Sequence, residues 1–312
     1  MTAKRFLLSV AAAGGAFTFC RWLTANQARI LAYHGVDDRD EPLLNFDGFH
    51  VHPEIFERHL RTLKGHYKVV PLRELAEIFQ RGEAPPPRAV AITFDDGYLN
   101  NLTHAAPLLN KYGLPATFFV TTGFMDGTHQ PWWFRLRSQI AASAKSSGEM
   151  KREIIATETE LKRMNATSRD EALATRGVPA AAPYPMLDWS GVKMLMEQGH
   201  EIGAHTVSHI SMGHETPKTV AREIRESIAR ISKMTGVSPT VYSYPYGEGD
   251  HQNETIARLV REAGCRGGVT SIEGLNPRGS DPFRLKRLNI TGHHDRNAFR
   301  ALVSGFTGAV RK

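Results

Sequence analysis

Two short stretches of the chain bring together residue types that bind metals or move protons. The first, AVAITFDDGYLNN, ends an apolar run in Asp95, Asp96 and Gly97. The second, GHEIGAHTVSHISMGH, places His205 and His209 four residues apart, just after the short apolar segment EIGA. Two buried carboxylates repel each other and lose water, so a metal, a turn or a catalytic proton must compensate their charge.

The spacing of the two histidines favours a metal. Four residues make about one turn of a helix or a tight loop, which brings both imidazoles to one side. Two histidines and one carboxylate leave positions open for water and substrate, as catalytic metal sites require. The zinc-protease pattern has a Glu base directly after its first His, whereas Thr206 stands here. The base of a hydrolytic site would therefore come from the Asp pair. The alternatives are an Asp-Gly turn with solvated carboxylates and two capping or surface histidines.

A third stretch, TVYSYPYGEGD, carries turn residues at the end of another apolar segment. Pro245 and Gly247 favour a tight turn that would aim the backbone N–H of Tyr246 into the site as an oxyanion donor. A simple turn explains these residues equally well.

The elements that must position these residues alternate along the chain from Ile30 onward. Short apolar or β-branched runs alternate with longer amphipathic ones, which is typical of β/α units around a parallel sheet. Seven or eight such units favour a β/α barrel, whose active site lies at the carboxyl ends of its strands. The predicted strands are RILAY, YKVV, AVAITF, ATFFVTT, EIGA, TVYSY, RGGVT and KRLNI.

Three helices between these strands carry start and stop signals. PEIFERHLRTLKGH opens with Pro53, TPKTVAREIRESIARISKMTG has Thr216 as its cap and Gly236 as its stop, and NETIARLVREAG ends on Gly264. Between Gly123 and Leu187 the alternation stops, and the chain is polar, charged and helix-prone. We therefore expect a helical insertion at about residues 124–186.

The insertion contains an aromatic pair, Trp132 and Trp133. Packing of the insertion onto the barrel is the favoured role of this pair. The alternative role is stacking on a sugar ring.

An apolar segment, residues 1–28, precedes the predicted domain at 29–312. Lys4 and Arg5 come before the apolar run from Phe6 to Cys20, which is the layout of a signal peptide. The run is short for a membrane-spanning helix. We expect a periplasmic or membrane-associated protein, with a cytoplasmic one as the alternative.

The composition limits the class of partner. A formal net charge of +7 and a pI of about 9.5 suit an acidic polysaccharide, a cell-wall polymer or membrane headgroups. Nucleic acid is disfavoured because basic residues interleave with Glu and form no Lys/Arg-rich block of five or more. Cys20 and Cys265 lie far apart, so they indicate neither a disulfide framework nor a cysteine zinc site.

The three motifs, in this order, resemble the polysaccharide deacetylase family, also called the NodB homology domain or carbohydrate esterase family 4. TFDDG matches the first family motif, HTVSH the second, and YPYG the third in part. The resemblance spans about residues 30–290. It implies an irregular (β/α) barrel of seven strands and removal of N- or O-acetyl groups from sugars. It also implies a divalent metal cofactor, zinc first, with cobalt or another transition metal as alternatives.

The resemblance also assigns roles residue by residue. Asp95 would be the general base, while Asp96, His205 and His209 would bind the metal. The metal would lower the pKa of its bound water toward 7, and Asp95 would accept the proton as the water attacks. The backbone N–H of Tyr246 would stabilise the oxyanion.

The chain departs from the family pattern at two places. No clean match exists to the late Leu-x-x-His motif of the usual general acid, and the alternatives are His294, beside His293, and His34 at the end of the first strand. Ser243 stands where many members carry an arginine that tunes the base, and Arg287 is the proposed substitute. No later Asp-x-x-Asp-Trp segment is found. With the YHGV start, these features look like the branch associated with bacterial exopolysaccharide or cell-envelope synthesis.

We therefore expect a metal-dependent hydrolase that removes N-acetyl groups from a glycan, with an acidic exopolysaccharide as one substrate. Two alternatives remain. One is a hydrolase of another non-peptide amide on the same fold. The other is a glycan-binding or assembly protein without catalytic activity, although degenerate relatives usually lose a metal ligand or the base, and this chain keeps all four.

Overall fold

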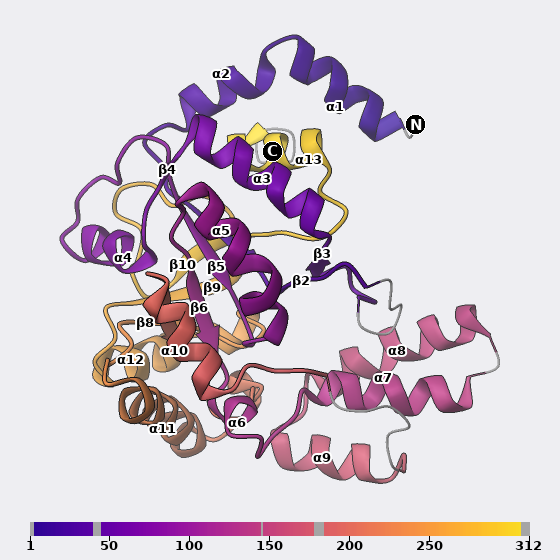
Figure 1. Cartoon of the computed structure of the whole chain (residues 1–312). Helices are drawn as coiled ribbons and strands as arrows, with labels where there is room; N and C mark the ends of the chain where they lie inside the picture. The colour runs from indigo at the N-terminus through magenta and orange to yellow at the C-terminus, as the bar shows by residue number, and fades with distance from the viewer. Residues whose placement is uncertain (1–2, 40–44, 145, 178–183, 307–312) are drawn as a thin grey trace.

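A closed barrel of parallel strands forms the centre of the computed structural model, which describes residues 3–39, 45–144, 146–177 and 184–306 (Figure 1). The strands pair in the order β1-β10-β9-β8-β7-β6-β5, and β5 pairs with β1 to close the ring. This confirms the predicted seven-stranded barrel. The strands are β1 Arg29–Tyr33, β5 Ala89–Phe94, β6 Thr117–Val120, β7 Glu201–Ala204, β8 Val241–Ser243, β9 Gly267–Glu273 and β10 Leu285–Asn289.

One of the eight predicted strands, YKVV, is present as β4 (Lys68–Val69) but lies outside the ring. β4 pairs with the first two residues of β5, and β6 pairs with the last two, so they share one edge of β5. Two further short strands, β2 (Gly35–Val36) and β3 (His50–Val51), form a separate pair that was not predicted.

The inside of the barrel is apolar at the end where the strands begin. One buried cluster joins Ile30, Ala91, Phe119, Val241 and Val269 from different strands, which only the interior of a closed ring permits. Helix α4 (Leu72–Gln80) adds residues to the same cluster and so covers this end of the barrel. The other end of the ring is left open for polar groups.

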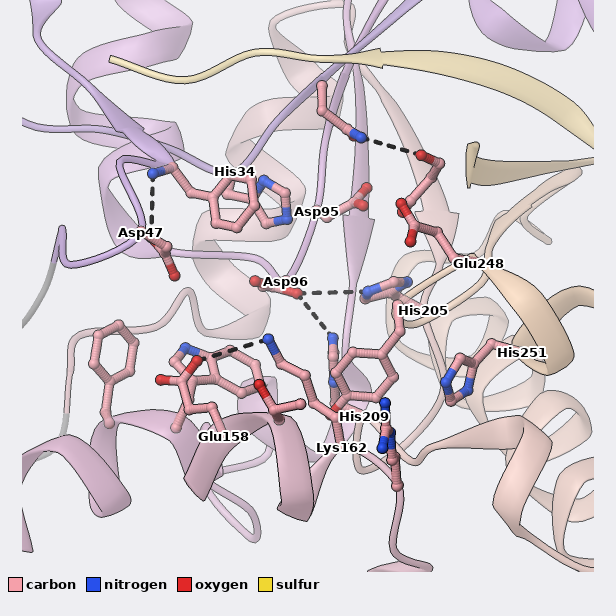
Figure 2. A pocket seen from close by; sticks show the side chains of 18 of the residues that line it. His34, Asp47, Asp95, Asp96, Glu158, Lys162, His205, His209, Glu248 and His251 are labelled. Atoms are coloured by element: carbon pink, nitrogen blue, oxygen red, sulfur yellow. Dashed lines mark hydrogen bonds and ion pairs between the residues drawn. The ribbon is translucent and has the colours of Figure 1, made fainter. Parts of the chain in front are cut away.

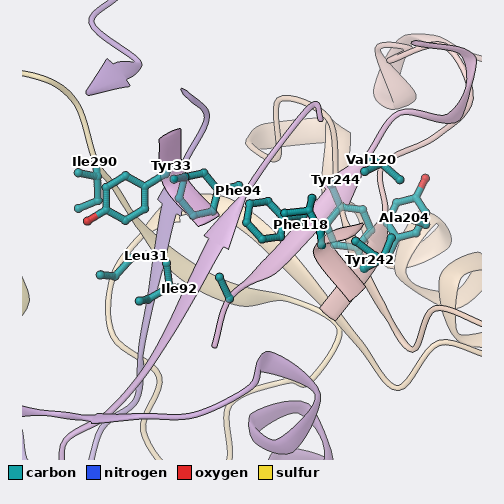
Figure 3. Packing of buried hydrophobic residues seen from close by; sticks show 14 of the residues in the cluster. Leu31, Tyr33, Ile92, Phe94, Phe118, Val120, Ala204, Tyr242, Tyr244 and Ile290 are labelled. Carbon is teal, nitrogen blue, oxygen red and sulfur yellow. The ribbon is translucent and has the colours of Figure 1, made fainter. Parts of the chain in front are cut away.

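A second apolar layer lies between the strands and the surrounding helices. Tyr33, Phe94 and Phe118 come from three adjacent strands and form a row, with ring centroids 5.3 and 4.9 Å apart (Figure 3). Phe56 of α3 packs edge-on against Tyr33 at 5.2 Å. Burial on both faces explains why these parallel strands have nearly continuous apolar sequences. The surrounding helices are α3 Pro53–His66, α5 Ala106–Tyr112, α10 Trp189–Glu197, α11 Pro217–Thr235, α12 Glu254–Glu262 and α13 Arg296–Ser304.

The three helices predicted from capping signals are confirmed as α3, α11 and α12. The Thr216 side chain accepts a hydrogen bond from the backbone of Thr219 at the start of α11, and Pro217 is its first residue. Gly236 ends this helix with φ 77°, a conformation that glycine adopts without steric cost.

The described part of the predicted insertion contains three helices, α7, α8 and α9, and a short helix, α6, overlaps its start; residues 145 and 178–183 lie outside the described part of the chain. Figure 1 shows α7, α8 and α9 together on one side of the barrel. They share a small apolar cluster of their own that includes Trp132, Ile140, Ile154 and Leu173. The helices are α6 Thr122–Met125, α7 Trp132–Ser143, α8 Ser147–Leu161 and α9 Ala166–Ala174.

The apolar segment predicted at residues 1–28 forms two short helices, α1 (Ala3–Ala13) and α2 (Ala16–Leu23), beside α13 (Figure 1). Residues 1 and 2 lie outside the described part of the chain. Among the described residues, no single helix is both long and apolar enough to cross a membrane. The two stretches Phe6–Ala13 and Ala16–Leu23 reach that length only together, with a bend of 72° between them.

Candidate active site

A cavity of about 690 Å³ opens where the strands end, and it brings most of the predicted site residues together (Figure 2). These residues follow different strands of the barrel, so the closed ring is what makes them neighbours. The volume is in the range of cavities that hold small molecules. The predicted residues that line it are His34, Asp95, Asp96, His205, His209 and Tyr246.

Asp96, His205 and His209 form a compact buried cluster. The Nε2 atoms of His205 and His209 lie 3.5 and 3.3 Å from Oδ1 of Asp96. One ligand atom from each residue falls within 4.8 Å of the other two. This spacing would let one cation contact all three groups.

The orientation of His205 supports this fit. Its Nδ1 lies 2.7 Å from the backbone carbonyl oxygen of Ser243. A carbonyl oxygen only accepts hydrogen bonds, so Nδ1 carries a proton and Nε2 is the nitrogen turned toward Asp96. Two imidazoles and a carboxylate suit zinc and related transition metals.

The backbone is left-handed at the positions that carry the site. Asp96, Thr206, His209 and Tyr246 have φ values of 75°, 65°, 53° and 62°, and only one other non-glycine residue in the described ranges has a positive φ. Such conformations cost roughly 1–3 kcal/mol each for residues with a Cβ. Their concentration here shows that surrounding contacts hold these loops.

One of those contacts comes from Glu223, a buried residue of α11. Its carboxylate accepts hydrogen bonds from the backbone N–H groups of Val207 and Ser208 at 2.8 and 3.0 Å, and from the Ser208 hydroxyl at 2.9 Å. The loop between His205 and His209 is therefore fixed by a charged side chain. Sequence reasoning missed Glu223, although an acidic residue on the apolar face of a helix was a signal.

Asp95 is held by an arginine from β10, the strand on the other side of β1 in the ring. Arg287 of β10 donates to Oδ1 and Oδ2 of Asp95 at 2.8 and 2.7 Å, a bidentate pair. Ser243 donates to Asp95 Oδ2 at 3.2 Å and accepts from Arg287 at 3.1 Å. Arg287 thus contacts Asp95 as proposed from the sequence, and the small side chain at 243 leaves room for its guanidinium.

The carboxyls of Asp95 and Asp96 are both held in the ionised form, for different reasons. Burial by itself raises the pKa of Asp95, but the charge and hydrogen bonds of Arg287 outweigh burial and lower it. Burial likewise opposes ionisation of Asp96, and hydrogen bonds from His205 and His209 hold its pKa well below the usual range. Asp95 thus has a cationic partner inside the barrel, while Asp96 faces the histidines.

Tyr246 lies in the turn after β8, and the insertion holds its side chain. Trp132 of α7 donates from Nε1 to the Tyr246 hydroxyl at 2.8 Å, and Arg169 of α9 approaches the same oxygen at 3.5 Å. Among the described residues, the backbone N–H of Tyr246 has no protein acceptor. It is therefore free to donate to an oxyanion. Trp132 is nearly fully buried, as a packing role requires.

Of the two histidines considered as general acid, the cavity contains His34 and not His294. His34 follows β1, and its ring is tilted by 32° against that of Phe49, with centroids 4.5 Å apart. The backbone N–H of Thr291 donates to Nδ1 of His294 at 3.0 Å, and the carbonyl of His294 contacts Nε2 of His59 at 2.8 Å. His294 therefore has a local bonding role beside α13.

The insertion supplies a wall of the cavity that the motifs did not predict. Trp133 packs edge-on against His209 at 4.8 Å. Arg137 is buried and bridges Asp47 and Glu158, each at 2.7 Å. Figure 2 shows Glu158 beside Lys162 of the same wall. No short motif marks these residues, because their common location depends on how the insertion docks.

Comparison with known proteins identifies clear relatives. A family model described as polysaccharide deacetylase matches residues 82–268. A poly-beta-1,6-N-acetyl-D-glucosamine N-deacetylase from Staphylococcus epidermidis is 32% identical over 295 residues, covering 91% of this chain and 84% of the relative. The protein of the same name from Staphylococcus aureus is 34% identical over 258 residues, covering 82% and 72%.

Two solved structures show the same barrel fold. The Streptococcus pyogenes deacetylase PplD in complex with acetate superposes with a TM-score of 0.65 at 19% identity, covering 89% of this chain and 98% of that one. IcaB from Ammonifex degensii has a TM-score of 0.61 at 19% identity, covering 89% and 97%. The agreement extends over nearly the whole of both proteins.

Proposed function

Because this chain belongs to the polysaccharide deacetylase family, we propose that it is a metal-dependent hydrolase that removes N-acetyl groups from an N-acetylglucosamine polymer. The observation that carries the proposal is the convergence of Asp95, Asp96, His205 and His209 in one cavity at the carboxyl ends of the strands. Asp95 is paired with Arg287. Asp96, His205 and His209 together form a set of groups that could bind a metal.

The metal would be held by Asp96, His205 and His209. The hydrogen bond from His205 to the Ser243 carbonyl fixes the tautomer that presents Nε2. When bound, a divalent metal, zinc first and cobalt as an alternative, would supply a Lewis acid and make water acidic enough to deprotonate near neutral pH.

Asp95 would act as the general base. Its carboxylate is ionised and its orientation is fixed by two hydrogen bonds from Arg287. Each carboxylate oxygen keeps a further lone pair, so Asp95 can take the proton of the attacking water. Attack on the acetamide carbonyl then places negative charge on its oxygen.

Tyr246 and His34 would complete the reaction. The backbone N–H of Tyr246 would donate to the oxyanion, an interaction that strengthens as the charge develops. His34 would donate a proton to the departing amine nitrogen as the carbon–nitrogen bond breaks. The products balance as acetate and a free amine on the sugar, with one water consumed.

The substrate class rests on the named relatives. Proteins called poly-beta-1,6-N-acetyl-D-glucosamine N-deacetylases are 32% and 34% identical to this chain over most of its length. A polymer of N-acetylglucosamine is thus the first substrate to test, and an enzyme for an exported glycan would work outside the cytoplasm. An acidic exopolysaccharide is a second substrate, suggested by the net charge of +7.

Acetate release from β-1,6-linked and β-1,4-linked N-acetylglucosamine oligomers tests the proposal. The comparison uses zinc-loaded protein, chelated protein and the Asp95→Asn variant, with Asp170→Asn, an exposed residue of α9, as the matched control. We expect release that is lost on chelation and in Asp95→Asn but retained in the control. Equal release with and without metal, or glycan binding without turnover, would refute it.

A further inference from the structure

We propose that α1 and α2 form a membrane-binding surface that lies flat on an anionic lipid bilayer. This inference concerns a face of the molecule outside the catalytic cavity and does not depend on the reaction. Ten large apolar side chains are exposed among the described residues, and six of them lie on these two helices. They are Phe6, Leu7, Val10, Phe19, Trp22 and Leu23.

The helix pair is attached to the domain through its opposite face. Phe17 is buried and meets the ring of Phe306 edge-on at 5.3 Å. The side chain of Thr24 donates to the carbonyl of Ser304 at 3.0 Å, and Asn297 of α13 donates to the Ser9 hydroxyl at 3.2 Å. These contacts fix which side of the helices faces outward.

The outward side has the composition of a membrane interface. Phe19 and Trp22 stack at 6.0 Å and expose 59% and 71% of their surfaces. Tryptophan is enriched at the level of lipid headgroups because it has both a large apolar ring and a polar N–H. Contiguous exposed apolar surface on a monomer usually marks an interaction site.

The geometry favours lying on a bilayer over crossing it. α1 has 11 residues and α2 has 8, which corresponds to roughly 16 and 12 Å at 1.5 Å per residue. A hydrocarbon core is about 30 Å thick. The 72° bend at Gly14 and Gly15 and the contacts with α13 hold both helices along the surface of the domain.

The charge around the pair complements anionic lipid. Residues 1–36 contain no Asp or Glu, so every charged side chain of the segment is basic. Arg21, Arg88 and Arg300 lie close enough to His66 to lower its pKa, in addition to the effect of burial. Basic residues beside an apolar helix face add attraction to acidic headgroups. A second copy of the chain would instead bring two such basic faces together.

Co-sedimentation of the full chain with large unilamellar vesicles tests the proposal, after mass spectrometry has verified that residues 1–28 are present. One set of vesicles contains phosphatidylglycerol and phosphatidylethanolamine, and the other contains phosphatidylcholine alone. The test variant is Phe19→Ser/Trp22→Ser. The matched control is Met194→Ser/Val237→Ser, which removes two exposed apolar side chains elsewhere.

We expect wild type and control to bind the anionic vesicles, and the test variant to bind at least about tenfold more weakly. Binding to phosphatidylcholine should be weaker, and salt should reduce the anionic binding. Unchanged binding by the test variant, or no binding by wild type, would overturn the proposal. A dimer of the wild type that the test variant abolishes, without vesicle binding, would show that a second copy covers this face. A thermal unfolding midpoint equal to that of wild type would verify that the test variant is folded.

Discussion

Replacing Arg287 by methionine should destabilise the protein, because the change leaves the Asp95 carboxylate buried without its cation. Both side chains are almost completely inaccessible to water, and two hydrogen bonds of 2.7 and 2.8 Å join them. Methionine fills much of the same volume but offers no donor. Among the described residues, the carboxylate would then keep only the 3.2 Å bond from Ser243.

The expected cost is about 3–5 kcal/mol in the free energy of unfolding, the typical result of removing one partner of a buried ion pair. The carbonyl of Thr270, which accepts from Nε of Arg287 at 2.7 Å, would lose its donor and add about 1 kcal/mol. The Asp95→Asn variant should also be destabilised, because it leaves the guanidinium without an anion. The double variant Asp95→Asn/Arg287→Met removes both charges together.

Urea unfolding of the chelated proteins measures all four states of this cycle, with Arg222→Met on the exposed face of α11 as the control. We expect Arg287→Met to cost at least about 2 kcal/mol less in the Asp95→Asn background than in wild type. The control should change stability by no more than about 0.5 kcal/mol. Additive single effects would show that Asp95 and Arg287 do not stabilise each other, and the assignment of Arg287 would fail.

Three further changes test other parts of the structure. Trp132→Phe removes the hydrogen bond to Tyr246 and should lower kcat roughly two- to tenfold with little change in KM, measured by steady-state acetate release. Gly247→Ala should cost more than about 2 kcal/mol in urea unfolding, because its Cβ would lie 2.4 Å from a backbone nitrogen of β9. Gly249→Ala, at a similar φ but in open space, should cost only about 1 kcal/mol. His59 has a pKa of about 4 when folded, lowered chiefly by burial, against 6.5 when unfolded. As the pH falls, the unfolded state binds a proton at His59 before the folded state does. The free energy of unfolding should therefore fall by about 2 kcal/mol between pH 7 and 5 because of this histidine, and the fall should be smaller in His59→Gln.

The sequence predicted the barrel well because its strands follow local rules. Strands buried on both faces appear as short apolar runs, and helices such as α11 start and end at residues with strong conformational preferences. The pairing of β5 with β1 follows from no local pattern. YKVV is as apolar as the other runs, yet it becomes the two-residue strand β4 beside the ring.

The site residues that were predicted from motifs lie close to one another in the sequence. Asp96 follows Asp95 directly, and His209 comes four positions after His205, so each pair is recognisable within one short stretch of sequence. Arg287 lies 192 residues from Asp95, and only the closed ring makes them partners. The bond between Trp132 and Tyr246 likewise depends on how the insertion docks.

The left-handed residues show why local rules fail at this site in particular. A positive φ is uncommon for any residue with a Cβ, although Asp and His adopt it more often than Tyr or Thr, so the HTVSH sequence by itself does not specify this conformation. In the folded chain, Glu223 binds the loop backbone at Val207 and Ser208, and so offsets the strain from a helix that the loop motif does not include. The geometry of the candidate metal-binding residues is therefore a property of the packed barrel and its helices, and the motif supplies only the chemical groups.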